Sequence, residues 1–225
     1  VIVAGKDKFQ VTSSNTKILF PFSLPGSSFN SGTNILVYFK QAMTSPPRSA
    51  GTFLLVHEML DKIKEKRRSW LYNPGQRRVS RAPFLSYDTY AQSSDGLRTY
   101  DQFDMFNWAT DRYEWTIDGK QEMYVPYNAY RLADKKPIKK NILDLHFLNP
   151  EYTRYELHRV WKVTANLKNG KSHIYPKRVF YFDEDSWQIL VSEIYDGRGD
   201  LWRFSEAYVI NYYEIPVPLA TAEIH

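Results

Sequence analysis

Hydrophobic and polar residues alternate along the C-terminal third of the chain. From Arg154 to Leu167, apolar residues occupy every second position and polar residues fill most of the others, a period of two that is typical of a half-buried β-strand. Similar runs follow and turn residues separate them, so we predict four sequential antiparallel strands between Arg154 and Tyr213. We expect the turns near Asn169–Gly170, Asp183–Ser186 and Gly197–Gly199.

The register of the first two strands follows from the turn between them. Asn169–Gly170 favours a two-residue hairpin turn, which would pair Lys168 with Lys171. This register places three pairs on one face: Leu157 with Phe182, Arg159 with Phe180, and Trp161 with Arg178. Two arginines then interrupt an apolar face, and each needs a carboxylate, a ring face or a ligand anion. The simple interpretation is a salt bridge to Asp101 or Asp104, and the alternative is a carboxylate or phosphate headgroup of a ligand.

Weaker patterns cover the rest of the chain. Ile35–Met43 and Thr52–Leu60 read as two strands, and a proline-containing connection separates them. Thr99 and Gln102 have the spacing of a capping box, which predicts a short helix near Thr99–Asn107. The remaining expected elements are extended segments at Trp70–Tyr72, Arg77–Ala82, Met123–Tyr130 and Thr221–His225, and one helical turn at Asn149–Glu151.

Composition narrows the class of protein. Aromatic residues make up 16% of the chain, with 17 tyrosines and 13 phenylalanines, and tyrosine is the aromatic residue that tolerates one end in water. Many rings are therefore expected to line a surface or a cavity. Cysteine is absent, which excludes disulfides and thiolate chemistry within these residues. No apolar run approaches the roughly 20 residues that span a bilayer, so we expect no membrane-spanning segment. The strand-like sequence at both ends predicts a fragment of a longer protein.

Positive charge is concentrated in one stretch of the chain. The formal net charge is +5. Eight basic residues fall within twenty positions, with only Glu65 opposing them: Lys62, Lys64, Lys66, Arg67, Arg68, Arg77, Arg78 and Arg81. We interpret them as the solvated surface of a hairpin. Arg67, Arg68, Arg77 and Arg78 are candidate contacts for an anion or an acidic partner, with weak and salt-sensitive binding. No nucleic-acid-binding motif accompanies the charge, so we expect no nucleic-acid partner.

Motifs for catalysis and cofactor binding are missing from the sequence. The five histidines show no metal-ligand spacing, and no P-loop, G-x-G-x-x-G or G-x-S-x-G motif is present. Carboxylate pairs at Asp101/Asp104 and Asp183/Asp185 leave a carboxylate-based hydrolase as a distant alternative, although turns and caps explain them equally well. We therefore expect no enzyme activity, no cofactor and no metal.

Five segments carry a resemblance to a known family. They are Tyr72–Val79, Asp95–Thr99, Asp101–Asn107, Tyr124–Asn128 and Tyr155–Trp161. Together they resemble the bacterial family called domain of unknown function 1329, and the likeness covers nearly the whole chain. The resemblance implies a secreted, periplasmic protein in which this block follows an N-terminal region and precedes one further strand.

A second, shorter resemblance concerns the strand–turn–strand segments Phe182–Leu190 and Tyr195–Arg203. They are similar to a signature of the periplasmic lipoprotein carriers LolA and LolB and of the regulator RseB. In that superfamily, an incompletely closed antiparallel barrel wraps around helices and encloses an apolar cavity for acyl chains. The resemblance implies a fold and a type of ligand, but it identifies no site.

The sequence therefore predicts one mainly β domain over residues 1–225, with a large curved antiparallel sheet that forms a half-barrel around short helices. The expected function is non-catalytic binding or carriage of a lipid or other hydrophobic ligand in the periplasm. The alternatives are an interaction module of an envelope complex or membrane transport protein, and the carboxylate-based hydrolase. We expect the ligand cavity to be lined by Leu157, Arg159, Trp161, Arg178, Phe180 and Phe182.

Overall fold

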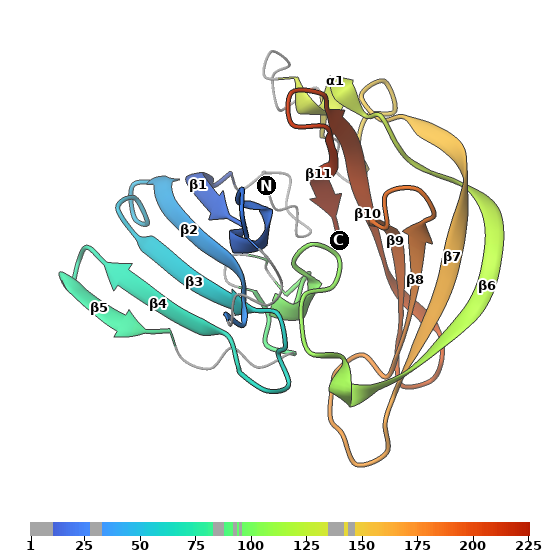
Figure 1. The fold of residues 1–225 in the computed structure, drawn as a ribbon, viewed down its shortest axis with the longest axis horizontal. Coiled ribbons are helices and arrows are strands. Elements are labelled where there is room, and N and C mark those ends of the chain that lie inside the picture. The colour runs from blue at the N-terminus through green and yellow to red at the C-terminus, as the bar shows by residue number, and fades with distance from the viewer. Residues whose placement is uncertain are drawn as a thin grey trace. The chain divides into compact units, whose positions relative to one another are not determined.

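The protein forms two antiparallel sheets in two compact units along the chain, Val1–Ser86 and Tyr87–His225. A computed structural model describes residues 11–27, 33–82, 88–91, 94, 96–134, 142–143 and 147–225 (Figure 1). The mainly β, antiparallel class predicted from the sequence is confirmed, and the strands are divided between two sheets. The expectation of a single domain over residues 1–225 stays a prediction.

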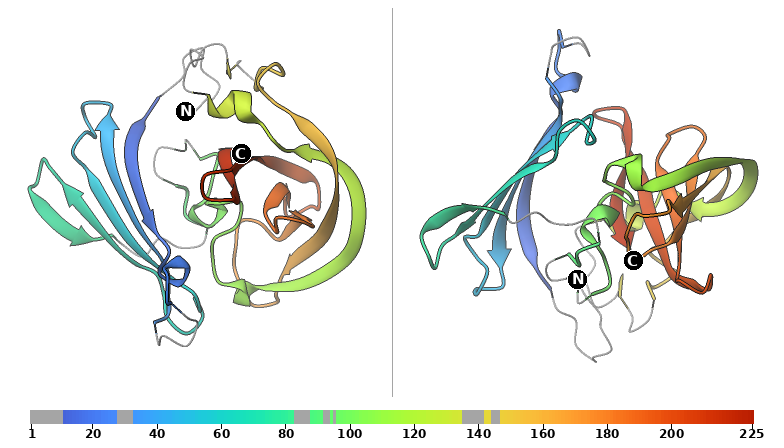
Figure 2. Two further views of the ribbon diagram at one scale, coloured as in Figure 1. Left: turned by 45° about the horizontal axis from the view of Figure 1, so that its top comes forward. Right: turned by 90° about the horizontal axis from the view of Figure 1, so that it is seen from below.

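The first unit is a five-stranded meander in which each strand pairs with the next one along the chain (Figure 2). Its elements are β1 (Ser13–Leu19), the 3-10 helix η1 (Pro21–Ser23), β2 (Ile35–Ser45), β3 (Phe53–Met59), β4 (Arg68–Asn73) and β5 (Arg78–Arg81). The strands predicted at Ile35–Met43 and Thr52–Leu60 are confirmed as β2 and β3. Asp61 ends β3 with a turn, because its Oδ1 accepts the backbone N–H groups of Ile63 and Lys64.

The second unit holds a six-stranded sheet with the order β11-β10-β9-β8-β7-β6. Its elements are the 3-10 helices η2 (Tyr100–Gln102) and η3 (Thr110–Arg112), β6 (Tyr113–Pro126), α1 (Tyr130–Ala133), β7 (Tyr155–Leu167), β8 (Lys177–Asp183), β9 (Ile189–Tyr195), β10 (Leu201–Tyr212) and β11 (Val217–Ile224). The four predicted strands are confirmed as β7 to β10. No described helix has the length and hydropathy that a bilayer crossing needs.

The six-stranded sheet curls at one end. A bridge joins Tyr127, which follows β6, to Val209 of β10, and Ala129 N–H donates to Val209 O at 3.3 Å. β6 and β7 bend strongly along their length around the strands beside them (Figure 1). A cluster of buried side chains lies where the sheet curls: Val125, Tyr127, Val160, Val179, Tyr181, Leu190, Val191 and Val209. Within the described residues the sheet keeps β6 and β11 as its edges, which fits an incompletely closed barrel.

The predicted pairing of β7 with β8 is wrong by four residues. The structure pairs Trp161 with Phe182, Val163 with Phe180 and Ala165 with Arg178. Lys171 N–H does donate to Lys168 O at 3.1 Å, and Gly170 has a φ of 77°, so a turn forms at Asn169–Gly170. The β7–β8 ladder does not continue up to this turn, however. Lys168 N–H donates to Arg112 O instead of to β8, and the bonding between the two strands begins where Leu167 N–H donates to Pro176 O. Residues 168–176 therefore form a loop instead of extending the hairpin.

Candidate functional site

The six residues predicted to line a cavity lie on one face of β7 and β8. A shift of four residues keeps every side chain on its predicted face, because side chains alternate with a period of two. Trp161 and Phe182 are direct cross-strand neighbours. Phe180 and Arg178 lie toward the β7–β8 loop, and Leu157 and Arg159 lie toward the other end of β7. The face therefore has two ends with different surroundings.

The end of the face around Phe180 is filled by the protein itself. Phe180 is 1% exposed and packs with Tyr113 and Ala165. Its ring centroid lies 5.5 Å from that of Phe106 and 5.8 Å from that of Trp115. Phe106 belongs to the segment between η2 and η3, so this segment covers the sheet here and fills the space beside Phe180.

Arg178 is buried among rings and one carboxylate. Its Nη2 donates to Asp101 Oδ2 at 2.5 Å, and its guanidinium lies 4.8 Å from the Tyr175 ring and 5.4 Å from the Tyr113 ring. For Arg178, the predicted salt bridge to Asp101 or Asp104 is confirmed, and Asp101 is the partner. For Arg159 this prediction is wrong, because Arg159 pairs with Glu184. His173 Nε2 lies 3.1 Å from the same Asp101 oxygen. This buried group of charged, polar and aromatic side chains ties η2, which precedes the covering segment, to β8.

The electrostatics of Asp101 follow from these contacts. Burial alone would raise the pKa of Asp101, but the charge of Arg178 and the hydrogen bonds from His173 and Thr99 outweigh it and lower the pKa. The predicted capping box is present: Thr99 N–H donates to Gln102 Oε1 at 2.9 Å. It opens only a three-residue 3-10 helix, shorter than the predicted helix near Thr99–Asn107.

The other end of the face is open. Leu157 is 56% exposed, and Tyr124, its partner on β6, is 69% exposed. Beside them, Arg159 forms an ion pair with Glu184, and Lys120 Nζ lies 3.2 Å from Glu184 Oε1. This end combines an apolar surface with a charged border. The predicted cavity lined by the six residues stays a prediction.

A hollow of about 260 Å³ lies elsewhere in the second unit. Arg98 and Phe103 line one part of it, and Ala220–Glu223 of β11 line the rest. None of the six predicted residues borders this hollow, so it adds nothing to the predicted face.

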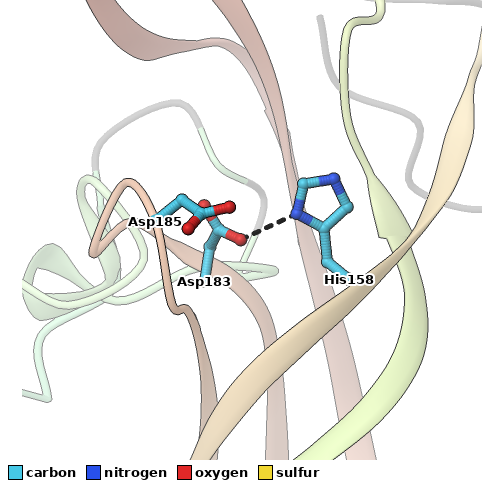
Figure 3. A group of neighbouring side chains, drawn as sticks. All are labelled: His158, Asp183 and Asp185. Atoms are coloured by element: carbon cyan, nitrogen blue, oxygen red, sulfur yellow. Dashed lines mark hydrogen bonds and ion pairs between the residues drawn. The ribbon is translucent and has the colours of Figure 1, made fainter.

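A polar cluster lies where β7 approaches the β8–β9 turn (Figure 3). It consists of His158 on β7, Asp183 at the end of β8, and Asp185 in the turn. His158 Nδ1 is 2.9 Å from Asp183 Oδ1. One ligand atom from each residue lies within 4.8 Å of the others. Such a set of one imidazole and two carboxylates has the chemistry to hold a metal ion.

Neighbouring groups fix the orientation of this cluster. Asp183 Oδ2 accepts hydrogen bonds from Ser186 N–H at 2.9 Å and Ser186 Oγ at 2.5 Å. The Tyr127 ring lies over the His158 ring with centroids 4.1 Å apart. Burial and the Asp183 carboxylate raise the pKa of Tyr127. Glu156 Oε2 lies 3.5 Å from His158 Nε2.

The sequence analysis missed this cluster because metal-ligand motifs join residues close together along the chain, whereas His158 is 25 residues from Asp183. The observed register opposes Val160 and Asp183, and extending it by two residues places His158 opposite Asp185. The predicted register instead placed His158 opposite Tyr181. The correct register was therefore the signal that would have revealed the cluster.

The basic stretch in the first unit is partly neutralised by that unit's own carboxylates. Arg67 Nη2 lies 2.6 Å from Glu58 Oε2, and Arg68 forms an ion pair with Glu65. Arg77 and Arg78 are exposed at the hairpin that joins β4 to β5. The role of these four arginines in binding an anion or a partner stays a prediction.

These features define a mainly β protein with two antiparallel sheets, one of which curls and buries an arginine–aspartate pair. The family model described as "Protein of unknown function (DUF1329)" matches residues 1–225. The chain belongs to this family, and the family prediction made from the sequence motifs is confirmed.

Similar proteins come from several bacteria. The chain is 54% identical over 194 residues to Uncharacterized protein PA3922 of Pseudomonas aeruginosa, a match that covers 86% of this chain and 43% of the relative. The chain thus spans less than half the length of that relative. A DUF1329 family protein from Desulfovibrio piger has a solved structure that is 15% identical, with a TM-score of 0.49 and coverage of 83% of this chain and 62% of that chain. The LolA superfamily protein NE2245 from Nitrosomonas europaea is 13% identical, with a TM-score of 0.41 and coverage of 95% and 75%.

Proposed function

We propose that this protein is a non-catalytic periplasmic protein that binds a lipid-like or other hydrophobic ligand. The observation that carries the proposal is the open end of the β7 face. Leu157 and Tyr124 oppose each other on neighbouring strands and both are exposed. Single exposed apolar residues are common on protein surfaces, whereas adjacent ones on a sheet face offer a continuous apolar contact.

The charged border supplies a contact for the polar end of such a ligand. Glu122 lies opposite Arg159, and Lys120 lies opposite Trp161, on the same face as Leu157. Lys120 Nζ is 4.5 Å from the centre of the Trp161 ring. An acyl or ring system on Leu157 and Tyr124 would place an anionic headgroup beside Arg159 and Lys120, where it would compete with Glu184 for them. This arrangement favours an amphipathic ligand over a purely apolar one.

The state of Asp101 favours a binding role over hydrolysis. Asp101 is 1% exposed, is paired with Arg178 and has a lowered pKa. A general acid in a glycosidase needs a carboxyl group with a raised pKa that reaches the substrate. Asp101 has neither property, so Asp101 is unsuited to act as the general acid of a hydrolase.

The proposal is tested by titrating the protein with a fluorescent fatty acid. Leu157→Asp should raise the apparent Kd of the probe at least tenfold, because it places a charge in the apolar contact. The matched control is Val79→Asp on β5, where Val79 is 60% exposed and belongs to the first sheet. The control should bind the probe as the parent protein does. Equal affinity of both variants, or no binding of the probe to the parent protein, would contradict the proposal.

A second candidate is an interaction module of an envelope complex or membrane transport protein. The filled space around Phe180 favours it, because a face already covered by its own chain offers a surface to a partner and little room for a ligand. Absence of probe binding in the same titration would leave this candidate in front.

A further inference from the structure

The cluster of His158, Asp183 and Asp185 has a donor set that suits a transition-metal ion. Zn²⁺ is bound by imidazole nitrogens and carboxylate oxygens at roughly 2.0–2.2 Å, and three protein ligands commonly leave one position for water or substrate. The three residues offer one nitrogen and two oxygens, all within 4.8 Å of one another. Imidazole favours Zn²⁺ and its neighbours in the transition series over Mg²⁺ and Ca²⁺.

Groups around the cluster are placed to orient its three side chains, as the groups around metal ligands do in known metal sites. A metal-binding histidine usually donates its second ring N–H to a carboxylate or carbonyl, which fixes the tautomer. Glu156 Oε2 is placed beside His158 Nε2 at 3.5 Å for this role. With the ion bound, Nδ1 would present its lone pair to that ion, which Asp183 Oδ1, 2.9 Å from Nδ1, would also bind. Ser186 binds the other oxygen of Asp183, which leaves Oδ1 for the ion.

The charge of the cluster gives an independent reason for a cation. The Asp183 side chain is 1% exposed. A buried carboxylate is costly without a positive partner. Among the ion pairs of the described residues, the only basic partner of Asp183 is His158, and Asp185 takes part in none. Arg154, the nearby permanent cation, pairs with Glu156 at 3.0 Å. Among the described residues, Asp183 therefore has no lysine or arginine in an ion pair with it, and Asp185 has only the longer-range attraction of Arg159, which itself pairs with Glu184. A divalent ion between the two aspartates would supply the positive charge.

The side-chain movement that would close the metal site falls on Asp185, the most exposed of the three ligands. In a tetrahedral Zn²⁺ site the ligand atoms lie about 3.3–3.5 Å from one another, closer than the 4.8 Å within which these atoms now lie. Asp185 is exposed in the β8–β9 turn, whereas Asp183 is held by Ser186. A rotamer change of Asp185 would close the site without moving β7 or β8.

We propose that His158, Asp183 and Asp185 bind one divalent transition-metal ion of the Zn²⁺ type. His158 Nδ1 and one oxygen from each aspartate are the ligands, and Glu156, Ser186 and Tyr127 orient them. The site is separate from the apolar surface at Leu157 and Tyr124, so it stands or fails independently of the proposed lipid-like ligand.

The test is a calorimetric titration of ZnCl₂ into protein that has been treated with a chelator and dialysed. The parent protein should bind one Zn²⁺ per chain with a micromolar or tighter Kd, and Asp185→Asn should weaken this binding at least tenfold. Asp185 is the chosen position because its side chain is exposed, so its removal should leave the fold intact. Asp200→Asn is the matched control, because Asp200 is an exposed acid in the β9–β10 turn.

A second variant and a second readout keep the assignment specific. His158→Gln should abolish the same binding step, and circular dichroism should confirm that each variant retains its strands. Trp187, two positions after Asp185 in the sequence, is 66% exposed, and Cu²⁺ bound at the site should quench its fluorescence. The proposal is overturned if the parent protein binds no Zn²⁺ at concentrations up to about 100 μM, roughly a hundredfold above the expected micromolar Kd, or if Asp185→Asn binds as tightly as Asp200→Asn.

Discussion

Asp101→Ala is expected to lower the free energy of unfolding by about 3–5 kcal/mol, the cost of leaving one partner of a buried ion pair alone. Arg178 is fully buried, and its Nε and Nη1 have no hydrogen-bond acceptor among the described residues. Loss of Asp101 would leave the guanidinium only with His173 and the surrounding rings. Urea denaturation followed by tryptophan fluorescence measures the change.

Two controls separate the buried pair from a general effect of charge. Arg198→Ala removes an exposed cation from the β9–β10 turn and should leave the unfolding midpoint unchanged within error, since exposed ion pairs contribute little. The double replacement Asp101→Leu with Arg178→Met should cost less than Asp101→Ala alone, because it leaves no unpaired buried charge. A small loss for Asp101→Ala would show that Arg178 finds another partner.

The contribution of Asp101 should also depend on pH. The pKa of Asp101 is lower in the folded protein than the value of about 3.9 expected for the unfolded chain. The unfolded state therefore takes up a proton first as the pH falls. The stabilisation is complete above about pH 5, and it is lost as the pH falls through the unfolded and then the folded pKa. The difference between the parent protein and Asp101→Ala should shrink over the same range.

Local patterns in the sequence predicted the strands, and one energetic argument predicted the ion pair. The alternation in β7 and the turn residues after β8 and β9 depend on nearest neighbours, so the four strands could be located. The need of Arg178 for a carboxylate followed from the cost of burying an unpaired charge, and this argument holds in either register. Both inferences survive the observed shift in pairing, because a shift of four residues leaves each side chain on its predicted face.

The register could not be predicted, because a distant contact sets it. Arg112 O, far from the turn along the chain, accepts the N–H of Lys168 and stops the ladder before Asn169–Gly170. The cluster at His158 depends on the same register, so it was missed with it. The first half of β6 was missed for a different reason. Asp118–Gly119 has the composition of a turn, but Gly119, with a φ of 126°, forms a bulge within one long strand.

Phe180→Ala is expected to lower the free energy of unfolding by about 3–5 kcal/mol, as large-to-small changes of buried aromatic residues do. Phe180 is 1% exposed, and the rings of Phe106 and Trp115 contact it from the covering segment and from β6. The covering segment is anchored at η2 by the Asp101–Arg178 ion pair and β6 by its pairing with β7. Neither can therefore collapse fully into the space left by the Phe180 ring, and a cavity should remain. Urea denaturation of the purified variant measures the loss.

Leu157→Ala provides the matched comparison on the same face. Leu157 is 56% exposed, so this change should alter the free energy of unfolding by less than about 0.5 kcal/mol. The contrast tests the division of the face into a filled end that stabilises the fold and an open end that is available to a ligand. If Leu157→Ala destabilised the protein as much as Phe180→Ala, Leu157 would be packed against another part of the protein in solution, and the open end could not serve as the ligand contact.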